Sequence, residues 1–380
     1  MSLQHFIGAD VFDGRVLHRG AALLVEAGQV VGVVPPGGAL PGARVMLRGG
    51  ILAPGLIDLQ VNGGDGVMLG DAATVAGIER ICAVHARLGS TALLPTLITD
   101  TPETARAVVA AGIAAARARV PGFLGLHLEG PHLDPSRKGA HDPRLIRAMD
   151  DADLALLLRA AAALPVLLVT LAPEAVAFTQ IAALAAAGVI VSLGHSDASC
   201  ATASQAFAAG ARLTTHLFNA MSPFGHREPG LVGATLDNAS VRASLICDGV
   251  HVAPEALRIA LAAKRGGGLF MVTDAMAVAG TGMTEFSLGG RRILRQAGRL
   301  TLEDGTLAGA DCDLPGAIAH LVNRVGVPLE VALAMATSAP AAAIGLQHRL
   351  GCFDPGLPAD MVHLGAGLAL NGVWRNGVRL

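Results

Sequence analysis

Four ionisable side chains in this sequence each stand at the end of a short apolar run. Glu129, His195, His216 and Asp274 follow the runs Leu126-His-Leu, Val189-Ile-Val-Ser-Leu-Gly, Leu213-Thr-Thr and Leu269-Phe-Met-Val-Thr. Each run has the length and composition of a buried strand. Because the carboxyl ends of parallel strands meet at one face of a barrel, we expect the four side chains to converge. Two imidazoles and two carboxylates there predict a hydrolytic metal site.

Glu129, His195 and His216 form the predicted metal-ligand set. Two imidazole nitrogens and a carboxylate suit Zn²⁺, with Fe²⁺ as the main competitor, and leave a coordination position open to water. Such a cation lowers the pKa of water towards about 7 and so supplies hydroxide at neutral pH. Asp274 is then the expected general base, which later returns the proton to a leaving nitrogen. The alternative roles for Asp274 are a fourth metal ligand or a brace for the Thr273 turn.

Two further histidines lie in loops that follow expected strands. His251 ends the segment Asp248-Gly-Val-His251 and can polarise a carbonyl oxygen or donate to an oxyanion. His141 ends Lys138-Gly-Ala-His141 and lies within reach of a polar substrate. Both are therefore candidates for contact with the substrate.

The long loop after the sixth expected strand has the residues to bind an anion. It covers residues 216–230, is rich in Gly and Pro, and carries Arg227, whose guanidinium can hold a phosphate through a fork of N–H donors. Asn219 and the backbone N–H of Ala220 can complete the cradle. Spacing alone is equally consistent with a surface ion pair between Arg227 and Glu228.

From residue 54 onward, apolar strand-like runs alternate with Ala-rich helical segments. Eight such units predict an α/β fold, a closed (β/α)8 TIM-like barrel, which takes about 250 residues. Further helix-like runs cover residues 314–324 and 329–343. The expected barrel strands are 55–60, 91–98, 122–128, 166–171, 189–194, 213–217, 242–247 and 268–273, and the helices include 74–88, 102–119 and 254–265.

The two ends of the chain carry short alternating segments instead. The N-terminal part contains Gln29-Val-Val-Gly-Val-Val, and the tail from Gly351 returns to a similar pattern. Neither end is long enough for a stable core alone, so we expect them to pair as one small discontinuous β-sandwich domain. The expected division is therefore residues 1–53 and 347–380 for this domain, and 54–346 for the barrel.

Composition excludes several classes of function. A hydrophobic content of 52% with 15% charged residues indicates a buried globular core rather than disorder. A net charge of -2, 3% aromatic residues and no basic block argue against nucleic-acid binding. Proline and charge interrupt the most apolar stretches, so no membrane span is expected, and the first residues lack the pattern of a secretory signal. The five cysteines form no CxxC pair, which favours reduced thiols in a cytoplasmic protein.

With these residues assembled, the chain closely resembles the N-acetylglucosamine-6-phosphate deacetylases, a family within the amidohydrolase superfamily. The matching motifs run along nearly the whole length: Pro54-Gly-Leu-Ile-Asp-Leu-Gln-Val-Asn-Gly-Gly64, His127-Leu-Glu-Gly-Pro-His132, Lys138-Gly-Ala-His141, Ser192-Leu-Gly-His-Ser196, Thr215-His-Leu-Phe-Asn-Ala-Met221, Arg227-Glu-Pro-Gly230, Asp248-Gly-Val-His251, Val272-Thr-Asp-Ala275 and Leu307-Ala-Gly309.

The resemblance implies a catalytic metal on Glu129, His195 and His216, with Asp274 as acid/base. It implies that His251 contacts the substrate's acetamido group. It also implies that sugar and phosphate are held by Ala140, His141, Asn219, Ala220, Arg227, Leu307, Ala308 and Gly309. In similar enzymes the matching arginine reaches the site of a neighbouring subunit, so a homodimer with Arg227 acting across it is implied.

One departure from the wider superfamily bears on the metal count. Where a His-x-His pair usually supplies a second metal, this chain has Gln60-Val-Asn62, and amides are poor substitutes for imidazole on zinc. The fourth expected strand also lacks the lysine that bridges two metals in related cyclic amidases. We therefore expect one divalent metal ion per subunit.

The resulting expectation is metal-dependent deacetylation of N-acetyl-D-glucosamine 6-phosphate to D-glucosamine 6-phosphate and acetate. The enzyme alternative is an amidohydrolase acting on a cyclic amide or on another N-acyl amino sugar. The alternative outside catalysis is a barrel that serves as a scaffold or binding module, but loss of a ligand or of the acid/base would then be expected, and all four residues are present.

Overall fold

The computed structural model describes residues 3–38, 42–264 and 267–380. The chain divides into two compact units, one of residues 1–58, 85–92 and 313–380, and the other of residues 59–84 and 93–312. The domain boundaries expected from the sequence, at residues 54 and 346, stay a proposal. Each unit is described by itself below.

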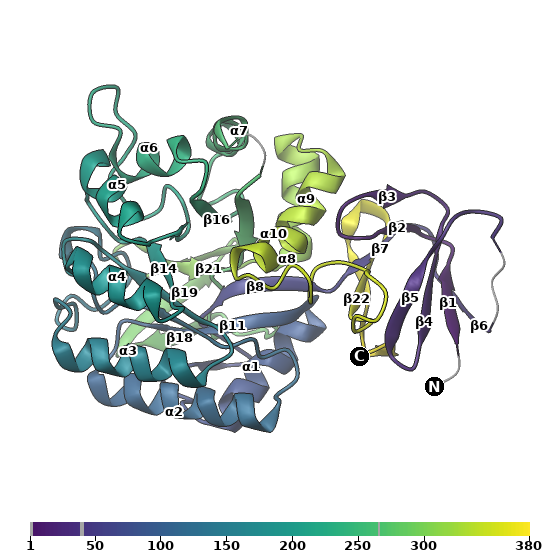
Figure 1. Ribbon diagram of the computed structural model, residues 1–380, viewed down its shortest axis with the longest axis horizontal. Helices are drawn as coiled ribbons and strands as arrows, with labels where there is room; N and C mark the ends of the chain where they lie inside the picture. Colours follow the sequence, from purple (N-terminus) through teal and green to yellow (C-terminus); the bar gives the residue numbers. More distant parts are fainter. Residues whose placement is uncertain (1–2, 39–41, 265–266) are drawn as a thin grey trace. The chain divides into compact units, whose positions relative to one another are not determined.

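Eight parallel strands form a nearly closed barrel (Figure 1). The sheet is closed at one end by a parallel bridge between Val61 and Ala275, where the N–H of Asp274 donates to the carbonyl of Gln60 at 3.0 Å. The predicted (β/α)8 barrel is therefore confirmed. In sheet order the strands are β17 (Leu269–Val272), β16 (Arg242–Ile246), β15 (Leu213–Thr214), β14 (Ile190–Leu193), β13 (Leu167–Leu171), β12 (Leu126–Glu129), β11 (Ser90–Ile98) and β8 (Leu56–Val61).

Helices alternate with these strands along the chain, and side-chain caps fix where several begin. Thr101 caps α2 by accepting from the N–H of Thr104, and Asp150 and Ser199 cap α3 and α5 in the same way. The helices are α1 (Val75–Arg87), α2 (Pro102–Ala118), α3 (Asp151–Ala163), α4 (Phe178–Ala186), α5 (Cys200–Ala208), α6 (Gly230–Asp237) and α7 (Pro254–Ala263). The helix predicted over 254–265 thus ends at Ala263, and Arg265 lies outside the described residues.

Two helices predicted near the C-terminus are each interrupted. The first consists of α8 (Leu314–His320) followed by a π-helical turn, Leu321–Val325. The second is divided at Thr337 into α9 (Leu329–Ala336) and α10 (Ser338–Ala343). Pro340 explains the division, because proline lacks an N–H and is accommodated only in the first turn of a helix.

The sequence analysis missed an antiparallel sheet that follows the last barrel strand. Its strands are β18 (Glu285–Leu288), β19 (Arg291–Gln296), β20 (Arg299–Thr301) and β21 (Leu307–Ala310). Phe286, Leu288, Ile293 and Leu300 of this sheet pack in one apolar cluster with Met276 of the barrel unit. The signals were an alternating apolar pattern and the hairpin turn Gly289–Gly290.

The N- and C-terminal strands form the expected β-domain. The strand β7 pairs with β2 on one side and with β22 on the other, so segments from both ends of the chain share one sheet. The two sheets of this domain have the orders β5-β4-β1-β6 and β24-β23-β22-β7-β2-β3, and they share a core that includes Phe6, Leu23, Leu52 and Trp374. The strands are β1 (Gln4–Ile7), β2 (Asp10–Phe12), β3 (Leu17–His18), β4 (Ala22–Glu26), β5 (Gln29–Val34), β6 (Ala43–Met46), β7 (Ile51–Pro54), β22 (Met361–Leu364), β23 (Leu370–Arg375) and β24 (Val378–Arg379).

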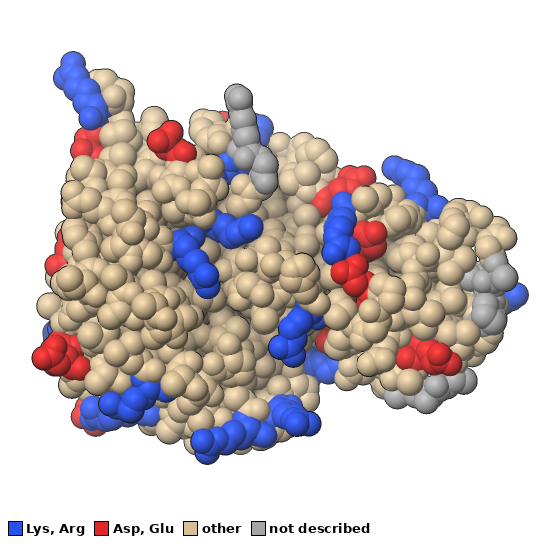
Figure 2. Space-filling model, viewed as in Figure 1, with Lys and Arg blue, Asp and Glu red and all other residues tan. Residues whose placement is uncertain are grey.

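The surface carries no extended area of one charge on the face seen in Figure 2, where basic and acidic side chains stand in small, separate groups. Among the described residues, no helix has the length and apolar character needed to cross a membrane. None of the five cysteines, all of which lie in the described part of the chain, forms a disulfide. A short two-stranded ribbon, β9 (Gly63–Gly64) with β10 (Val67–Met68), completes the strands of the barrel unit.

Candidate active site

The four predicted residues lie at the carboxyl ends of four barrel strands, of which β14 and β15 are neighbours in the sheet. Glu129 is the last residue of β12, and the other three stand in the turns after β14, β15 and β17. His195, His216 and Asp274 all have positive φ angles, of 49°, 35° and 54°. Such conformations are uncommon outside glycine and cluster at functional sites. Each strand therefore ends in a sharp turn that directs a polar side chain into the barrel mouth.

Three ligand-type atoms form a compact triangle. Oε1 of Glu129 lies 3.0 Å from Nε2 of His216 and 3.3 Å from Nε2 of His195, and the two nitrogens are 3.1 Å apart. Ligands at about 2.0–2.1 Å from a tetrahedral Zn²⁺ are separated by about 3.3 Å, so the triangle has the size of one face of such a site. The donor set therefore fits a divalent cation.

Backbone contacts prepare the histidines for this role. Nδ1 of His195 lies 2.9 Å from the carbonyl oxygen of Arg137, to which it can only donate, and this leaves the lone pair of Nε2 for a cation. The N–H of His216 donates to Oγ of Ser244 at 2.7 Å, which fixes the turn after β15. Nδ1 of His216 is buried and has no hydrogen-bond partner among the described residues.

The charges of the cluster are mutually dependent. Burial acts to raise the pKa of Glu129, but the hydrogen bonds from His195 and His216 outweigh it and hold the pKa well below its usual range. Burial acts to lower the pKa of His216, and the carboxylate of Glu129 outweighs burial and raises it. A cation bound here would compete with protons for the same ligand atoms.

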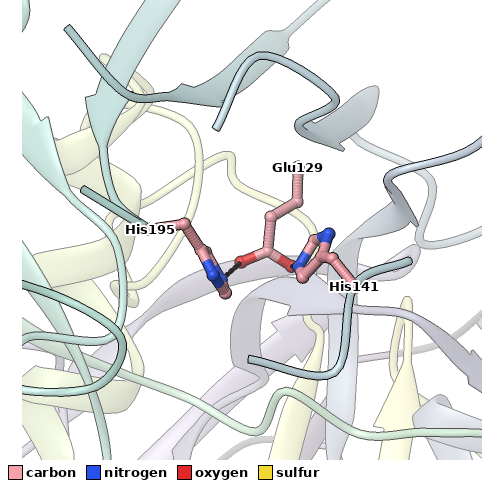
Figure 3. A group of neighbouring side chains, drawn as sticks. All are labelled: Glu129, His141 and His195. Carbon is pink, nitrogen blue, oxygen red and sulfur yellow. Dashed lines mark ion pairs between the residues drawn. The ribbon is translucent and has the colours of Figure 1, made fainter. Parts of the chain in front are cut away.

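His141, which was predicted to contact the substrate, lies close to two of the predicted metal ligands. Ligand-type atoms of Glu129, His141 and His195 all lie within 4.8 Å of one another, and Figure 3 shows the three side chains pointing together. Nε2 of His141 is 3.8 Å from Oε2 of Glu129, whereas Nδ1 is held 2.7 Å from Oγ1 of Thr99. Nε2 of His216 lies 3.0 Å from Oε1 of Glu129, closer than Nε2 of His141 lies to Oε2. The triangle predicted from the sequence, which contains His216 rather than His141, is therefore the tighter one. Burial, followed by the charge of His195, lowers the pKa of His141 to about 3, so this side chain is neutral.

Asp274 is held by the two amides that replace the His-x-His pair. Nε2 of Gln60 donates to Oδ1 of Asp274 at 3.1 Å and to Oε1 of Glu129 at 3.0 Å, and Nδ2 of Asn62 donates to the same Oδ1 at 2.7 Å. Burial, followed by the charge of Glu129, raises the pKa of Asp274 to about 6. Its Oδ1 is thus occupied by two donors, and a carboxyl group with this pKa can both accept and return a proton near neutrality.

His251 is fixed by an aspartate of its own loop. Oδ2 of Asp248 lies 2.7 Å from Nδ1 of His251, while Oδ1 accepts the N–H groups of Val250 and His251, each at 2.9 Å. The contact orients the imidazole so that its other nitrogen is available at the pocket that His251 lines.

One pocket of about 350 Å³ brings most of the predicted residues together. Its lining contains the three predicted metal ligands, Asp274 and the predicted substrate contacts Ala140, His141, Asn219, Ala220, His251, Leu307 and Gly309. Gly309 must be glycine, since a Cβ at this position would lie 2.5 Å from Cγ of Met276 and 2.8 Å from the carbonyl oxygen of Asp274.

Two of the predicted substrate contacts, Ala308 and Arg227, are not among the residues that line the pocket. The side chain of Ala308 is fully buried in the apolar cluster of the β18–β21 sheet. Arg227 is exposed and does not line the pocket. The roles of both stay predictions.

The pocket also has walls that the sequence analysis did not name. They are formed by Arg137 and Ser136 on the polar side and by Ile98, Ile246, Met276 and Leu288 on the apolar side. Arg137 directly precedes the quoted motif Lys138-Gly-Ala-His141, so the motif itself was the signal that could have found it. The apolar residues carry no signal beyond ordinary core positions.

Comparison with known proteins agrees with this geometry. Residues 51–379 match the Amidohydrolase family. The chain belongs to this family. It is accordingly a hydrolase acting on an amide.

Individual relatives cover most of this amidohydrolase. The N-acetylgalactosamine-6-phosphate deacetylase of Shewanella sp. (strain ANA-3) is 39% identical over 331 residues, which are 87% of this chain and 83% of the relative. The N-acetylglucosamine-6-phosphate deacetylase of Haemophilus influenzae is 34% identical over 366 residues, 94% of this chain and 95% of the relative. The structure of an aspartate-to-alanine mutant of the Mycobacterium smegmatis N-acetyl-D-glucosamine-6-phosphate deacetylase, in complex with N-acetyl-D-glucosamine-6-phosphate, has a TM-score of 0.90 at 34% identity and covers 99% of this chain and 98% of that one. The resemblance drawn from the motifs is thus confirmed.

Proposed function

We propose that this amidohydrolase removes the acetyl group of N-acetyl-D-glucosamine 6-phosphate, giving D-glucosamine 6-phosphate and acetate. The observation that carries the proposal is the ligand triangle of Glu129, His195 and His216 beside Asp274 in one pocket. Relatives with names for this activity span nearly the whole chain, and one similar structure contains the substrate.

One divalent cation per subunit, Zn²⁺ or else Fe²⁺, is proposed on the triangle. When bound, it supplies an activated water and a Lewis acid. A second cation is disfavoured, because Gln60 and Asn62 point their NH₂ groups at the carboxylates, and an NH₂ group is a donor that cannot ligate.

Asp274 carries the proton in the proposed reaction. Its Oδ1 is occupied by the amides of Gln60 and Asn62, so Oδ2 is the oxygen that takes the proton from the attacking water. The new C–O bond forms at the acetyl carbon, and the C–N bond breaks as the same carboxyl group returns the proton to the amine nitrogen. The second proton of the water leaves the carboxyl product and is taken up by the amine or by solvent, so the products at neutral pH are acetate and the protonated amine.

Two histidines are available to stabilise negative charge on the acetyl oxygen. His251 is the one assigned from the sequence, and Asp248 holds it at the pocket. His141 lies beside Glu129 and His195, so it is also placed to meet this oxygen. Separate His251→Gln and His141→Gln variants identify the donor, since the true one lowers kcat with little change in KM.

The phosphate is proposed to meet Asn219 and the N–H of Ala220, which line the pocket, and Arg227 from a second subunit. The exposure of Arg227 and its absence from the pocket lining of its own chain support a homodimer in which the loop serves the neighbouring site. A cytoplasmic location is also proposed, because none of the five cysteines of the described chain forms a disulfide.

A second candidate substrate is N-acetyl-D-galactosamine 6-phosphate. The observation in its favour is the 39% identity to the Shewanella relative, whose name carries that activity. The two sugars differ only in the orientation of one hydroxyl group, so both retain the acetamide and the phosphate.

An acetate-release assay on both sugar phosphates and on unphosphorylated N-acetyl-D-glucosamine tests the proposal. We expect the highest kcat/KM with N-acetyl-D-glucosamine 6-phosphate. A higher kcat/KM with N-acetyl-D-galactosamine 6-phosphate would favour the second candidate substrate. Equal values of kcat/KM with phosphorylated and unphosphorylated N-acetyl-D-glucosamine would show that the enzyme does not recognise the phosphate.

A further inference from the structure

A pocket for a phosphorylated sugar needs a fixed positive charge, and the chain supplies one that motif matching passes over. Among the residues that line the pocket, Arg137 is the one arginine or lysine. It stands at the end of the short 3₁₀ turn Pro135–Arg137, which Asp134 caps by accepting the N–H of Ser136 at 2.8 Å.

The guanidinium of Arg137 is held by one edge only. Nε and Nη2 both donate to Oδ1 of Asp197, at 2.8 and 2.6 Å. Among the described residues, Nη1 has no hydrogen-bond partner, and the side chain is 33% exposed. A guanidinium tethered in this way keeps two N–H donors in a fixed direction, which reduces the entropy lost when an anion binds.

The backbone of Arg137 is equally constrained. Its N–H donates to the carbonyl of Asp134 at 3.0 Å, and its carbonyl oxygen receives Nδ1 of His195 at 2.9 Å. The residue therefore joins the rim of the pocket to a metal ligand through its main chain, while its side chain remains available to the substrate. A side-chain substitution at this position leaves the contact to His195 in place.

We propose that Arg137 binds the phosphate group of the substrate within its own subunit, through the Nη1 edge that Asp197 leaves unoccupied. This inference rests on the proposed function only for the identity of the substrate. Arg227 is exposed and does not line the pocket of its own chain. The proposal therefore gives each subunit a positive charge of its own, that of Arg137, for binding the phosphate.

The variants are Arg137→Gln, Arg137→Lys and, as a matched control, Arg144→Gln. Arg144 lies seven positions further along, is also paired with an aspartate, Asp142, and does not line the pocket. Charge-assisted bonds to phosphate are strong, so we expect Arg137→Gln to raise KM for N-acetyl-D-glucosamine 6-phosphate about tenfold or more with kcat and bound metal unchanged. Arg137→Lys recovers part of the loss because it keeps the charge and loses the fork. Arg144→Gln behaves as the wild type.

Binding of inorganic phosphate alone, measured by calorimetry on the metal-loaded protein, separates this inference from the proposed function. If the wild type binds phosphate and Arg137→Gln does not, the assignment stands even when the sugar phosphate is not turned over. Unchanged phosphate binding in Arg137→Gln would overturn it. A lower metal content and a lower kcat of Arg137→Gln with an unchanged KM would also overturn the proposal, because Arg137 would then act only by holding His195.

Discussion

Asn62 donates a 2.7 Å hydrogen bond from Nδ2 to Oδ1 of Asp274, the oxygen that also accepts from Nε2 of Gln60. Two amide groups therefore occupy one oxygen of this carboxylate. If Asp274 is the proposed acid/base, the contact from Asn62 helps to fix its other oxygen, Oδ2, as the one that takes the proton.

Asn62→Ala removes this donor and lets the carboxylate rotate. We expect kcat to fall by roughly 10- to 100-fold, the range typical for loss of a group that orients a catalytic residue. KM and metal content should stay close to the wild type, because Nδ2 of Asn62 donates to Asp274 and to the sulfur of Met276 rather than to the ligand triangle. Steady-state kinetics with metal analysis on the same preparation measure all three, and an unchanged kcat would show that the orientation of Asp274 does not depend on this bond.

The activity should have an acidic limb set by Asp274. Burial and the charge of Glu129 raise its pKa to about 6, and only the ionised form can accept a proton. A bound cation lowers this pKa, so kcat/KM should fall as the pH decreases through a midpoint at or below about 6. Asp274→Asn should have almost no turnover at any pH while keeping its metal. An acidic limb with the same midpoint in that variant would assign it to another group.

Stability should depend on pH through buried histidines, most clearly through His127. Its ring lies 2.7 Å from Oγ1 of Thr170, and burial lowers its pKa to about 4. The unfolded chain binds this proton below about pH 6.5 and the folded chain does not, so the free energy of unfolding falls as the pH decreases from about 6.5 to 4.

The expected contribution of His127 is on the order of 3 kcal/mol. Urea unfolding of the metal-free protein at several pH values measures it. His127→Gln, which keeps a polar group in the barrel, should show a shallower dependence over the same range. A variant with the wild-type slope would assign the pH dependence to other groups, such as His141.

The proposed action of Arg227 across a dimer predicts complementation. Arg227→Gln and Asp274→Asn should each be nearly inactive alone. Mixed dimers combine an intact Asp274 from one subunit with an intact Arg227 from the other, so an equimolar mixture should recover up to about a quarter of the wild-type activity after exchange. Activity that never exceeds the sum of the separate variants would contradict a role for Arg227 in trans.

The sequence predicted the barrel, and it predicted that Glu129, His195 and His216 meet at one site, because both follow from local patterns. Apolar runs that end at Glu129, His195 and His216 indicate strand ends, and strand ends of a barrel converge by geometry. The alternating pattern of the β18–β21 sheet was overlooked because its segments are short, and the shortest strand, β20 at Arg299–Thr301, has three residues. The exact place of His141 was also beyond the sequence, since a loop residue is positioned by tertiary contacts such as the one to Thr99.

The position of Arg137 at the pocket could not be predicted from the sequence either. Its neighbours Lys138 to His141 form a recognised motif, but nothing in the spacing distinguishes an arginine that lines a pocket from one that pairs on the surface. Only the fold reveals that Asp197, sixty positions away, holds one edge of the guanidinium and leaves the other unoccupied.

Metal content and acetate release, measured together on one sample before and after chelation, test the account most directly. We predict that protein carrying one equivalent of Zn²⁺ or Fe²⁺ converts N-acetyl-D-glucosamine 6-phosphate, that chelation removes both metal and activity, and that re-addition of the metal restores both. The His195→Ala variant should bind little metal and release little acetate. Full turnover by thoroughly chelated protein would contradict the account.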